Sequence, residues 1–187
     1  MLSASDKQFL LKVARHTVES VVNNSSLPQI EPCPPALKQP CGAFVTLRQE
    51  SELRGCIGYT EDAKPLVETV QEVAAKAATD DPRFMAVFPA ELPLIEIEIS
   101  VISLMKPLKN IDEIEIGKHG LLLEWRDLRG LLLPQVPVEY GWNKEMFLNQ
   151  VSRKAGLPAI AWRDPETNLF TFTAEVFKEH SSELAKR

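Results

Sequence analysis

The order of predicted elements occurs twice along this chain, and this repeat is the feature that most constrains the fold. Two short β-rich runs, a helical stretch and an alternating apolar run follow one another at about residues 42–105 and again at about 117–177. The two copies also share residues. Leu53 to Gly55 and Leu128 to Gly130 both read Leu-Arg-Gly, at the start of the second strand of each predicted hairpin. These matching positions indicate an ancient duplication.

Hairpin-linked strands accompanied by helices are typical of an antiparallel sheet in an α+β fold. The apolar periodicity predicts strands over residues 43–47, 53–59, 95–101, 120–125, 130–136 and 170–176, and helices over 6–22, 65–79 and 143–156. A capping box of Ser5 and Gln8 is expected to start the first helix. Five prolines within residues 27–40 oppose a helix or a central strand and predict an extended segment that packs over the body of the protein. We expect residues 1–187 to form a single domain.

The composition is that of an ordinary folded protein. Hydrophobic residues make up 44% and charged residues 25% of the 187 positions, so a packed core needs no disulfide or metal. The net charge of -5 opposes a large basic surface for nucleic acid. No apolar run approaches the length of about 18 residues that a membrane helix needs, and the N-terminus does not resemble a secretory signal. We therefore expect a cytoplasmic protein whose cysteines, Cys33, Cys41 and Cys56, are reduced thiols.

The run from Leu53 to Tyr59, Leu-Arg-Gly-Cys-Ile-Gly-Tyr, is the most informative stretch for function. Strict alternation along a strand places Arg54, Cys56 and Gly58 on one face. A cation about 7 Å from a thiol stabilises the thiolate by about 0.6 kcal/mol at a dielectric constant of about 80, and by about 2.5 kcal/mol at about 20. Cys56 is therefore either a nucleophile in a partly desolvated cleft or a thiol that packs as a small apolar side chain.

The neighbours of Cys56 also have two interpretations each. Arg54 is either a clamp for a carboxylate or phosphate, or a structural cation that satisfies buried carbonyls or Asp81. Gly55 and Gly58 permit the close approach of either a ligand or another backbone segment. The first interpretation in each pair predicts a binding site around the thiol, and the second predicts a packed scaffold.

Other candidate residues lie outside this run. His119 is either a general base or the cap of a turn. Asp80, Asp81 and Arg83 either gather at a cleft or form a hydrogen-bonded turn. The sequence contains no HExxH, CxxC, GxGxxG or P-loop pattern, so we expect no metal, nucleotide or other cofactor to be bound by this chain.

Further motifs follow one another in a distinctive order between about Ala36 and Phe177. They are residues 53–58 (LRGCIG), 81–84 (DPRF), 96–101 (EIEISV), 117 with 119–120, 131–136 (LLLPQV), 140–142 (YGW) and 154–158 (KAGLP). In this order they resemble the AMMECR-type domain family, whose prokaryotic relatives are called AmmeMemoRadiSam system protein A. One departure is Ser152, where relatives often carry a cysteine, so a mechanism that requires a second thiol there does not transfer to this chain.

The resemblance implies an α+β fold with a larger and a smaller lobe around a cleft. The candidate catalytic residues of this chain are Cys56 and His119, and the candidate binding residues of the cleft are Arg54, Gly55, Gly58, Tyr59, Asp81 and Arg83. The family name implies a modification pathway with a Memo-like protein and a radical S-adenosylmethionine enzyme as possible partners. An enzymatic or substrate-handling component of that pathway is the first hypothesis. A non-catalytic protein-interaction module is the alternative, and nucleic-acid binding is a remote one.

Overall fold

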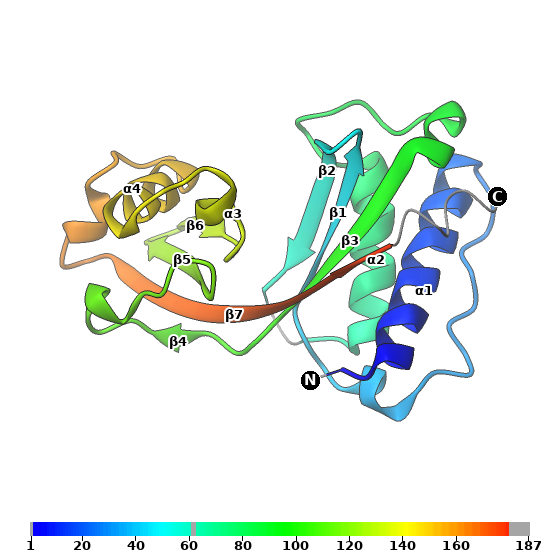
Figure 1. Cartoon of the computed structure of the whole chain (residues 1–187), viewed down its shortest axis with the longest axis horizontal. Helices are drawn as coiled ribbons and strands as arrows, with labels where there is room; N and C mark the ends of the chain where they lie inside the picture. Colours follow the sequence, from blue (N-terminus) through cyan, green and yellow to red (C-terminus); the bar gives the residue numbers. More distant parts are fainter. Residues whose placement is uncertain (1, 61–62, 180–187) are drawn as a thin grey trace. The chain divides into compact units, whose positions relative to one another are not determined.

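The computed structural model describes residues 2–60 and 63–179, which form an α+β fold (Figure 1). The antiparallel strands follow the order β2-β1-β3-β7-β5-β6, and β4 pairs with β7. The chain divides into two compact units. One contains the chain up to Ile102 and from Glu175 onward, and the other is Ser103–Ala174. The predicted fold class is confirmed, and no helix within the described residues is long and apolar enough to cross a membrane.

The first unit packs two helices on one face of its strands. The elements are α1 (Ala4–Val22), β1 (Ala43–Gln49), β2 (Glu52–Tyr59), α2 (Leu66–Thr79), the 3₁₀ helix η2 (Pro89–Leu94) and β3 (Ile95–Ile102). Helix α2 packs on β1 and β2, α1 packs on β3, and the two helices contact each other (Figure 1). Ile95, Ile97 and Ile99 alternate into this core with no exposed surface, as side chains at a period of two should. The predicted strands and helices of this half agree with the structure to within about two residues.

The second unit repeats a hairpin and a helix around its own core. Its elements are β4 (Lys106–Pro107), η3 (Ile111–Glu113), β5 (His119–Trp125), β6 (Leu128–Leu132), α3 (Val136–Glu139), α4 (Lys144–Lys154), η4 (Ala161–Arg163) and most of β7 (Asn168–Lys178). Leu121, Leu123, Phe147 and Val151 form the fully buried centre. As predicted, Asn143 starts α4, because its side chain accepts the backbone N–H of Met146.

The start of α1 corrects the sequence analysis. The capping residue is Ser3, whose hydroxyl accepts the N–H of Asp6, while the Asp6 carboxylate accepts the N–H of Ser3. Each of these hydrogen bonds is 3.1 Å long. The helix therefore begins two residues earlier than the predicted pair of Ser5 and Gln8 implied. A carboxylate at the third helical position completes the capping box here, and the sequence offers two overlapping choices of serine.

The proline-rich segment, residues 27–40, is not extended throughout. Pro35–Lys38 form the 3₁₀ helix η1, which places Leu37 in the core with no exposed surface. Proline suits the first position of such a turn because its φ is already near the required value and its missing N–H would have no partner there. The prediction of an extended path is therefore wrong over these four residues.

The second hairpin also ends earlier than predicted. Strand β6 stops at Leu132, and residues 136–139 form the short helix α3 instead of continuing the strand. Pro134 and Pro137 have no backbone N–H to donate to a sheet, which explains why the apolar run beyond Leu132 leaves it.

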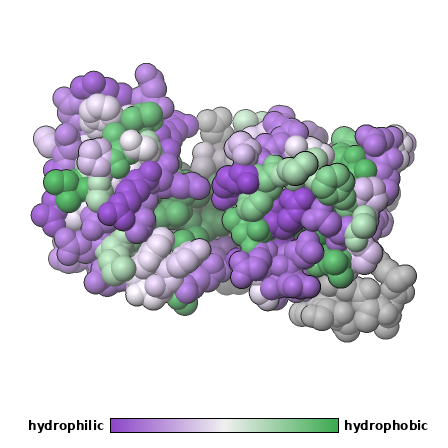
Figure 2. Space-filling view, turned by 90° about the horizontal axis from the view of Figure 1, so that it is seen from above, coloured by the Kyte–Doolittle hydropathy of each residue, from purple (hydrophilic) through white to green (hydrophobic). Residues whose placement is uncertain are grey.

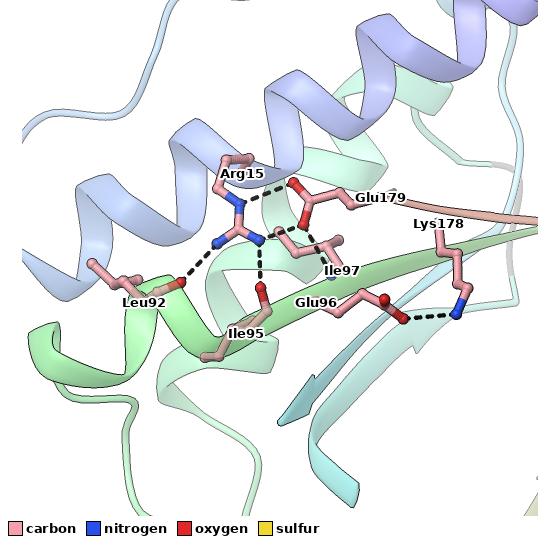
Figure 3. Close-up of polar contacts among 7 residues, drawn as sticks. All are labelled: Arg15, Leu92, Ile95, Glu96, Ile97, Lys178 and Glu179. Carbon is pink, nitrogen blue, oxygen red and sulfur yellow. Dashed lines mark hydrogen bonds and ion pairs between the residues drawn. The ribbon is translucent and has the colours of Figure 1, made fainter. Parts of the chain in front are cut away.

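A buried ion pair holds the end of β7 beside β3 in the first unit (Figure 3). The side chains of Arg15 and Glu179 are 2% and 8% exposed, and they form two hydrogen bonds to each other. The Arg15 guanidinium also donates to the carbonyls of Leu92 and Ile95, and Glu179 accepts the N–H of Ile97. These added hydrogen bonds offset the cost of removing both charges from water. Nothing in the sequence indicated this pair, whose members are 164 residues apart.

Candidate functional site

The two glycines of the run from Leu53 to Tyr59 serve packing. A Cβ atom on Gly55 would lie 2.2 Å from the Ala77 carbonyl oxygen of α2, so only glycine permits this close contact between strand and helix. A Cβ atom on Gly58 would lie 2.2 Å from the ring of Phe44, which is its partner on β1. The sequence left open whether these glycines permit the approach of a ligand or of another protein segment. In the structure, protein atoms lie against both of them.

Arg54 forms a scaffold contact because the hairpin is irregular at this residue. The pairing runs from Leu47 with Gly55 directly to Arg48 with Leu53, which leaves Arg54 without a partner on β1. Such a bulge redirects the side chain of the extra residue. The expected pairing of this cation with the Cys56 thiol is therefore wrong.

The Arg54 guanidinium binds the Glu91 carboxylate through two hydrogen bonds, 2.7 Å from Nε and 3.0 Å from Nη2. It also donates to the carbonyls of Met85 and Ala86. The two charged side chains are only 16% and 21% exposed. Arg54 lowers the pKa of Glu91, which therefore remains a carboxylate in the folded protein. Arg54 is a structural cation that satisfies carbonyls, one of the two alternatives that the sequence left open.

Asp81 and Arg83 bind the backbone of Cys56 at the edge of the sheet. The N–H of Cys56 donates to Asp81 Oδ2 over 2.8 Å, and Arg83 Nη2 donates to the Cys56 carbonyl over 3.1 Å. Strand β2 is the outermost strand of the sheet, so these side chains occupy backbone groups that would otherwise be unpaired. The structure thus brings together three of the predicted site residues.

The Asp81 carboxylate also holds Arg83 in place, through bonds of 2.9 Å to Nε and 2.7 Å to Nη2. This guanidinium lowers the pKa of Asp81 to about 2, against the opposing effect of burial. The Asp81 side chain is 3% exposed and that of Arg83 is 44% exposed. The result is a buried anion that positions a solvent-accessible cation.

The Cys56 thiol lies between a hydroxyl and this cation. Thr46, its partner on β1, donates from Oγ1 to Cys56 Sγ over 3.3 Å. Arg83 interacts with the thiol as well: its pKa is raised first by Asp81 and further by Cys56. Arg83 therefore takes the role expected of Arg54. A hydroxyl donor and a guanidinium each favour the ionised form of a thiol, whereas a carboxylate such as that of Asp81 opposes it.

Tyr59, at the end of β2, belongs to a different set of side chains, which it forms with Lys64 and with Glu72 and Lys76 of α2. Its hydroxyl donates to Glu72 over 2.7 Å and accepts from Lys76 over 2.5 Å, while Lys64 donates to the second Glu72 oxygen. These three donors, Lys64 foremost, lower the pKa of Glu72 to about 2. A pocket of about 360 Å³ lies here, lined by Gly58, Tyr59, Thr60, Ala63, Lys64, Thr69 and Glu72.

His119 lies in the second unit, whereas Cys56 lies in the first. Its Nδ1 accepts the N–H of Glu115 over 3.2 Å, and its own N–H donates to the Glu115 carbonyl. These are the contacts of a turn cap, one of the two interpretations of this histidine. In the part of the chain that the structure describes, His, Cys, Asp and Glu side chains form no group of three or more that could hold a metal ion.

Three residues around the site escaped the sequence analysis. Glu91 follows a loop and Glu72 lies on a helix surface, so neither had a motif that connected it to the run from Leu53 to Tyr59. Thr46 lies in the first strand of the predicted hairpin, but a regular hairpin with a two-residue turn would place it opposite Gly55. The bulge at Arg54 places it opposite Cys56 instead, so no signal in the sequence pointed to this contact.

Comparisons with known proteins identify the family of this chain and a solved structure with a similar fold. The family model AMMECR1 matches residues 11–177. A protein of Thermococcus gammatolerans is 43% identical over 185 residues, which cover 92% of this chain and 89% of that protein. A protein of Methanothermobacter thermautotrophicus is 42% identical, with coverage of 95% and 96%. The crystal structure of uncharacterized protein PH0010 from Pyrococcus horikoshii matches with a TM-score of 0.93 and 36% identity, over 96% of this chain and 94% of that one. The chain belongs to the AMMECR1 family.

Proposed function

We propose that this protein is an enzymatic or substrate-handling component of a cytoplasmic modification pathway and that Cys56 is its reactive group. The observation that carries the proposal is the Arg83 guanidinium, which Asp81 holds against Cys56. A neighbouring cation favours the thiolate, which is the nucleophilic form of cysteine. Because Arg83 is partly exposed, it can also contact an anionic group of a substrate. A Memo-like protein and a radical S-adenosylmethionine enzyme are the partners that the family resemblance suggests.

The pH dependence of alkylation tests this proposal. In a Cys33→Ser, Cys41→Ser background, the rate of reaction with iodoacetamide is measured from pH 5 to 10 by mass spectrometry. We expect Cys56 to titrate at least about one unit below the value of about 8.5 for a free cysteine. Arg83→Met should raise that apparent pKa by about one unit, because the thiolate loses its cation.

The matched control is Arg54→Met, which removes the cation that the structure pairs with Glu91. This variant should leave the apparent pKa of Cys56 unchanged. A wild-type thiol that titrates near 8.5, or that fails to react across the whole range as a buried thiol would, contradicts the proposal.

A non-catalytic protein-interaction module is the second candidate, supported by apolar residues exposed near Arg54. Leu53, Met85, Phe88 and Leu94 are 37%, 75%, 55% and 54% exposed. Figure 2 views the molecule from above Figure 1, the side on which the loop between α2 and β3 lies, and on the unit that contains this loop green apolar surface lies among purple hydrophilic surface. Exposed large apolar side chains in one region are typical of partner-binding surfaces.

Capture of the Memo-like protein or the radical enzyme separates the two candidates. For an interaction module, binding survives Cys56→Ser and is lost in a Met85→Ser, Phe88→Ser double variant. Loss of binding in Cys56→Ser, with binding retained in the double variant, contradicts the module and supports a site centred on the thiol.

A further inference from the structure

Cys56 is one member of a polar row that crosses three strands. Thr46 on β1 is directly opposite Cys56 on β2, and on its other side it is opposite Glu98 on β3. Gly55 lies on the sheet face that packs against α2, and this row lies on the other face. Thr46 is 4% exposed, and its Oγ1 donates to Cys56 Sγ over 3.3 Å.

The buried Thr46 hydroxyl needs a hydrogen-bond acceptor, and this need bears on the ionisation state of the Cys56 sulfur. Within the described residues, Cys56 Sγ is the hydrogen-bond partner found for this hydroxyl. A neutral thiol is a weak acceptor, and a buried hydroxyl without a good acceptor destabilises a protein. A thiolate is a charged acceptor and makes a stronger, charge-assisted hydrogen bond. The ionised form of Cys56 is therefore the form that satisfies Thr46.

The second unit provides an internal comparison for this row. The two units are aligned by matching Gly55 with Gly130. The row of strand residues that faces the helix is then alike in both units, a glycine beside two apolar residues: Gly55, Leu47 and Ile97 in the first and Gly130, Leu123 and Leu169 in the second. The next row along differs in every position: Cys56, Thr46 and Glu98 in the first unit align with Leu131, Leu122 and Phe170 in the second. The second hairpin forms with an apolar row, so a hydroxyl beside a thiol is not a requirement of this architecture.

We infer that Thr46 is a positioning residue of the Cys56 site, whose hydroxyl donates to the thiolate from within the sheet while Arg83 faces it from the sheet edge. On ionisation the S–H bond breaks, the proton passes to water and the sulfur retains the electron pair. The Thr46 hydroxyl keeps its own proton and turns it toward the sulfur. This inference rests on the proposed function, because a positioned thiolate matters only if Cys56 reacts.

Valine and serine substitutions at Thr46 test the inference. In the Cys33→Ser, Cys41→Ser background, Thr46→Val keeps the branched shape and removes the donor. It should raise the apparent pKa of Cys56 by about one unit, and thiolate absorbance near 240 nm at pH 7 should fall several-fold. Thr46→Ser should restore the wild-type profile, because serine keeps the hydroxyl. Far-ultraviolet circular dichroism verifies that each variant is folded.

The outcomes separate the inference from the proposal beneath it. If Thr46→Val titrates like the wild type while Arg83→Met shifts the profile, Thr46 has no positioning role and the proposed function stands. If the wild-type thiol itself titrates near 8.5, the proposed function fails first.

The second unit supplies the matched control. A Leu131→Cys substitution in a background without the three native cysteines places a thiol at the aligned position, opposite Leu122. This thiol should titrate at or above about 8.5, since it lacks the hydroxyl partner. Adding Leu122→Thr should lower its apparent pKa. A Leu131→Cys thiol that is as acidic as Cys56 would assign the effect to the hairpin backbone and overturn the inference.

Discussion

The Leu-Arg-Gly sequence occurs in both units. Its glycine has the same role in each unit, whereas its arginine does not. A Cβ atom on Gly55 would lie 2.2 Å from the Ala77 carbonyl oxygen of α2, and one on Gly130 would lie 2.4 Å from the Val151 carbonyl oxygen of α4. The glycine therefore has the same task twice, which is to let a helix approach a strand. Where a helix packs on a strand backbone, both units have glycine.

The arginines differ because the first hairpin is one residue longer. Leu47 pairs with Gly55, a separation of 55 − 47 = 8, whereas Leu123 pairs with Gly130, a separation of 130 − 123 = 7. Both hairpins turn through two residues, so the extra residue of the first is absorbed as a bulge. The bulge directs Arg54 to Glu91, and the regular second hairpin leaves Arg129 opposite Glu124 at 2.8 Å. One added residue is enough to move a side chain from a surface pair to a structural anchor.

The largest expected effect comes from the shared glycine. Gly55→Ala and Gly130→Ala should each destabilise the protein by about 3 kcal/mol or more, because the new methyl group overlaps backbone atoms of a helix. Urea unfolding monitored by circular dichroism measures the change. Gly141→Ala is the control: it meets no atom within 4 Å and should cost only about 1 kcal/mol, through its positive φ of +63°. A tolerated substitution at either Gly55 or Gly130 would break the equivalence of the two units.

The next largest effect concerns Asp81, which closes the edge of β2 in the first unit. Its folded pKa of about 2 lies below its ordinary value of 3.8, so its contribution is fully present above about pH 4 and is lost as the pH falls through 2. Asp81→Asn should therefore reduce stability by about 2 kcal/mol at pH 7 and by almost nothing near pH 2. Unfolding curves of both proteins across this range check the sign.

Glu72 provides the comparison for that experiment. Its pKa is also lowered to about 2, but its side chain is 32% exposed and its partners are surface lysines. Glu72→Gln should therefore cost less than about 1 kcal/mol at pH 7. An equal pH dependence for the two variants would show that the edge contact at Cys56 adds nothing beyond a surface ion pair.

The smallest effect tests the arginines themselves. Arg54→Met should cost about 1.5 kcal/mol, because Glu91 and two carbonyls lose a partly buried partner. Arg129→Met should cost less than about 0.5 kcal/mol, since Arg129 is 59% exposed and solvent screens its charge. Thermal unfolding of the two variants measures the difference. Equal losses would mean that the bulge has not changed what this arginine does.

Much of the fold follows from local patterns in the sequence. The alternation of Ile95, Ile97 and Ile99 predicts a half-buried strand, and Asn143 predicts the start of α4, because each pattern reports directly on neighbouring backbone. Errors arose where two local solutions compete, as with Ser3 and Ser5 at the start of α1. They also arose where prolines end a strand that apolarity alone would continue, beyond Leu132.

The candidate site was only partly predictable. The sequence identified Cys56, Asp81 and Arg83 as candidates, and the structure brings these three together. It identified the wrong cation for the thiol, because strict alternation ignores a bulge that depends on the register of the opposite strand. The predictions of a cleft, of a catalytic His119 and of pathway partners stay predictions.

By itself, the sequence determined the order of elements, the antiparallel α+β class and the resemblance to the family. These properties depend on the spacing of apolar residues and turns, which are interactions between near neighbours along the chain. Only the tertiary structure decided that Arg83 faces Cys56 while Arg54 faces Glu91, and that Thr46 donates to the sulfur. Those contacts depend on one residue of register and on loops folding back over a strand edge, and neither leaves a periodic trace in the sequence.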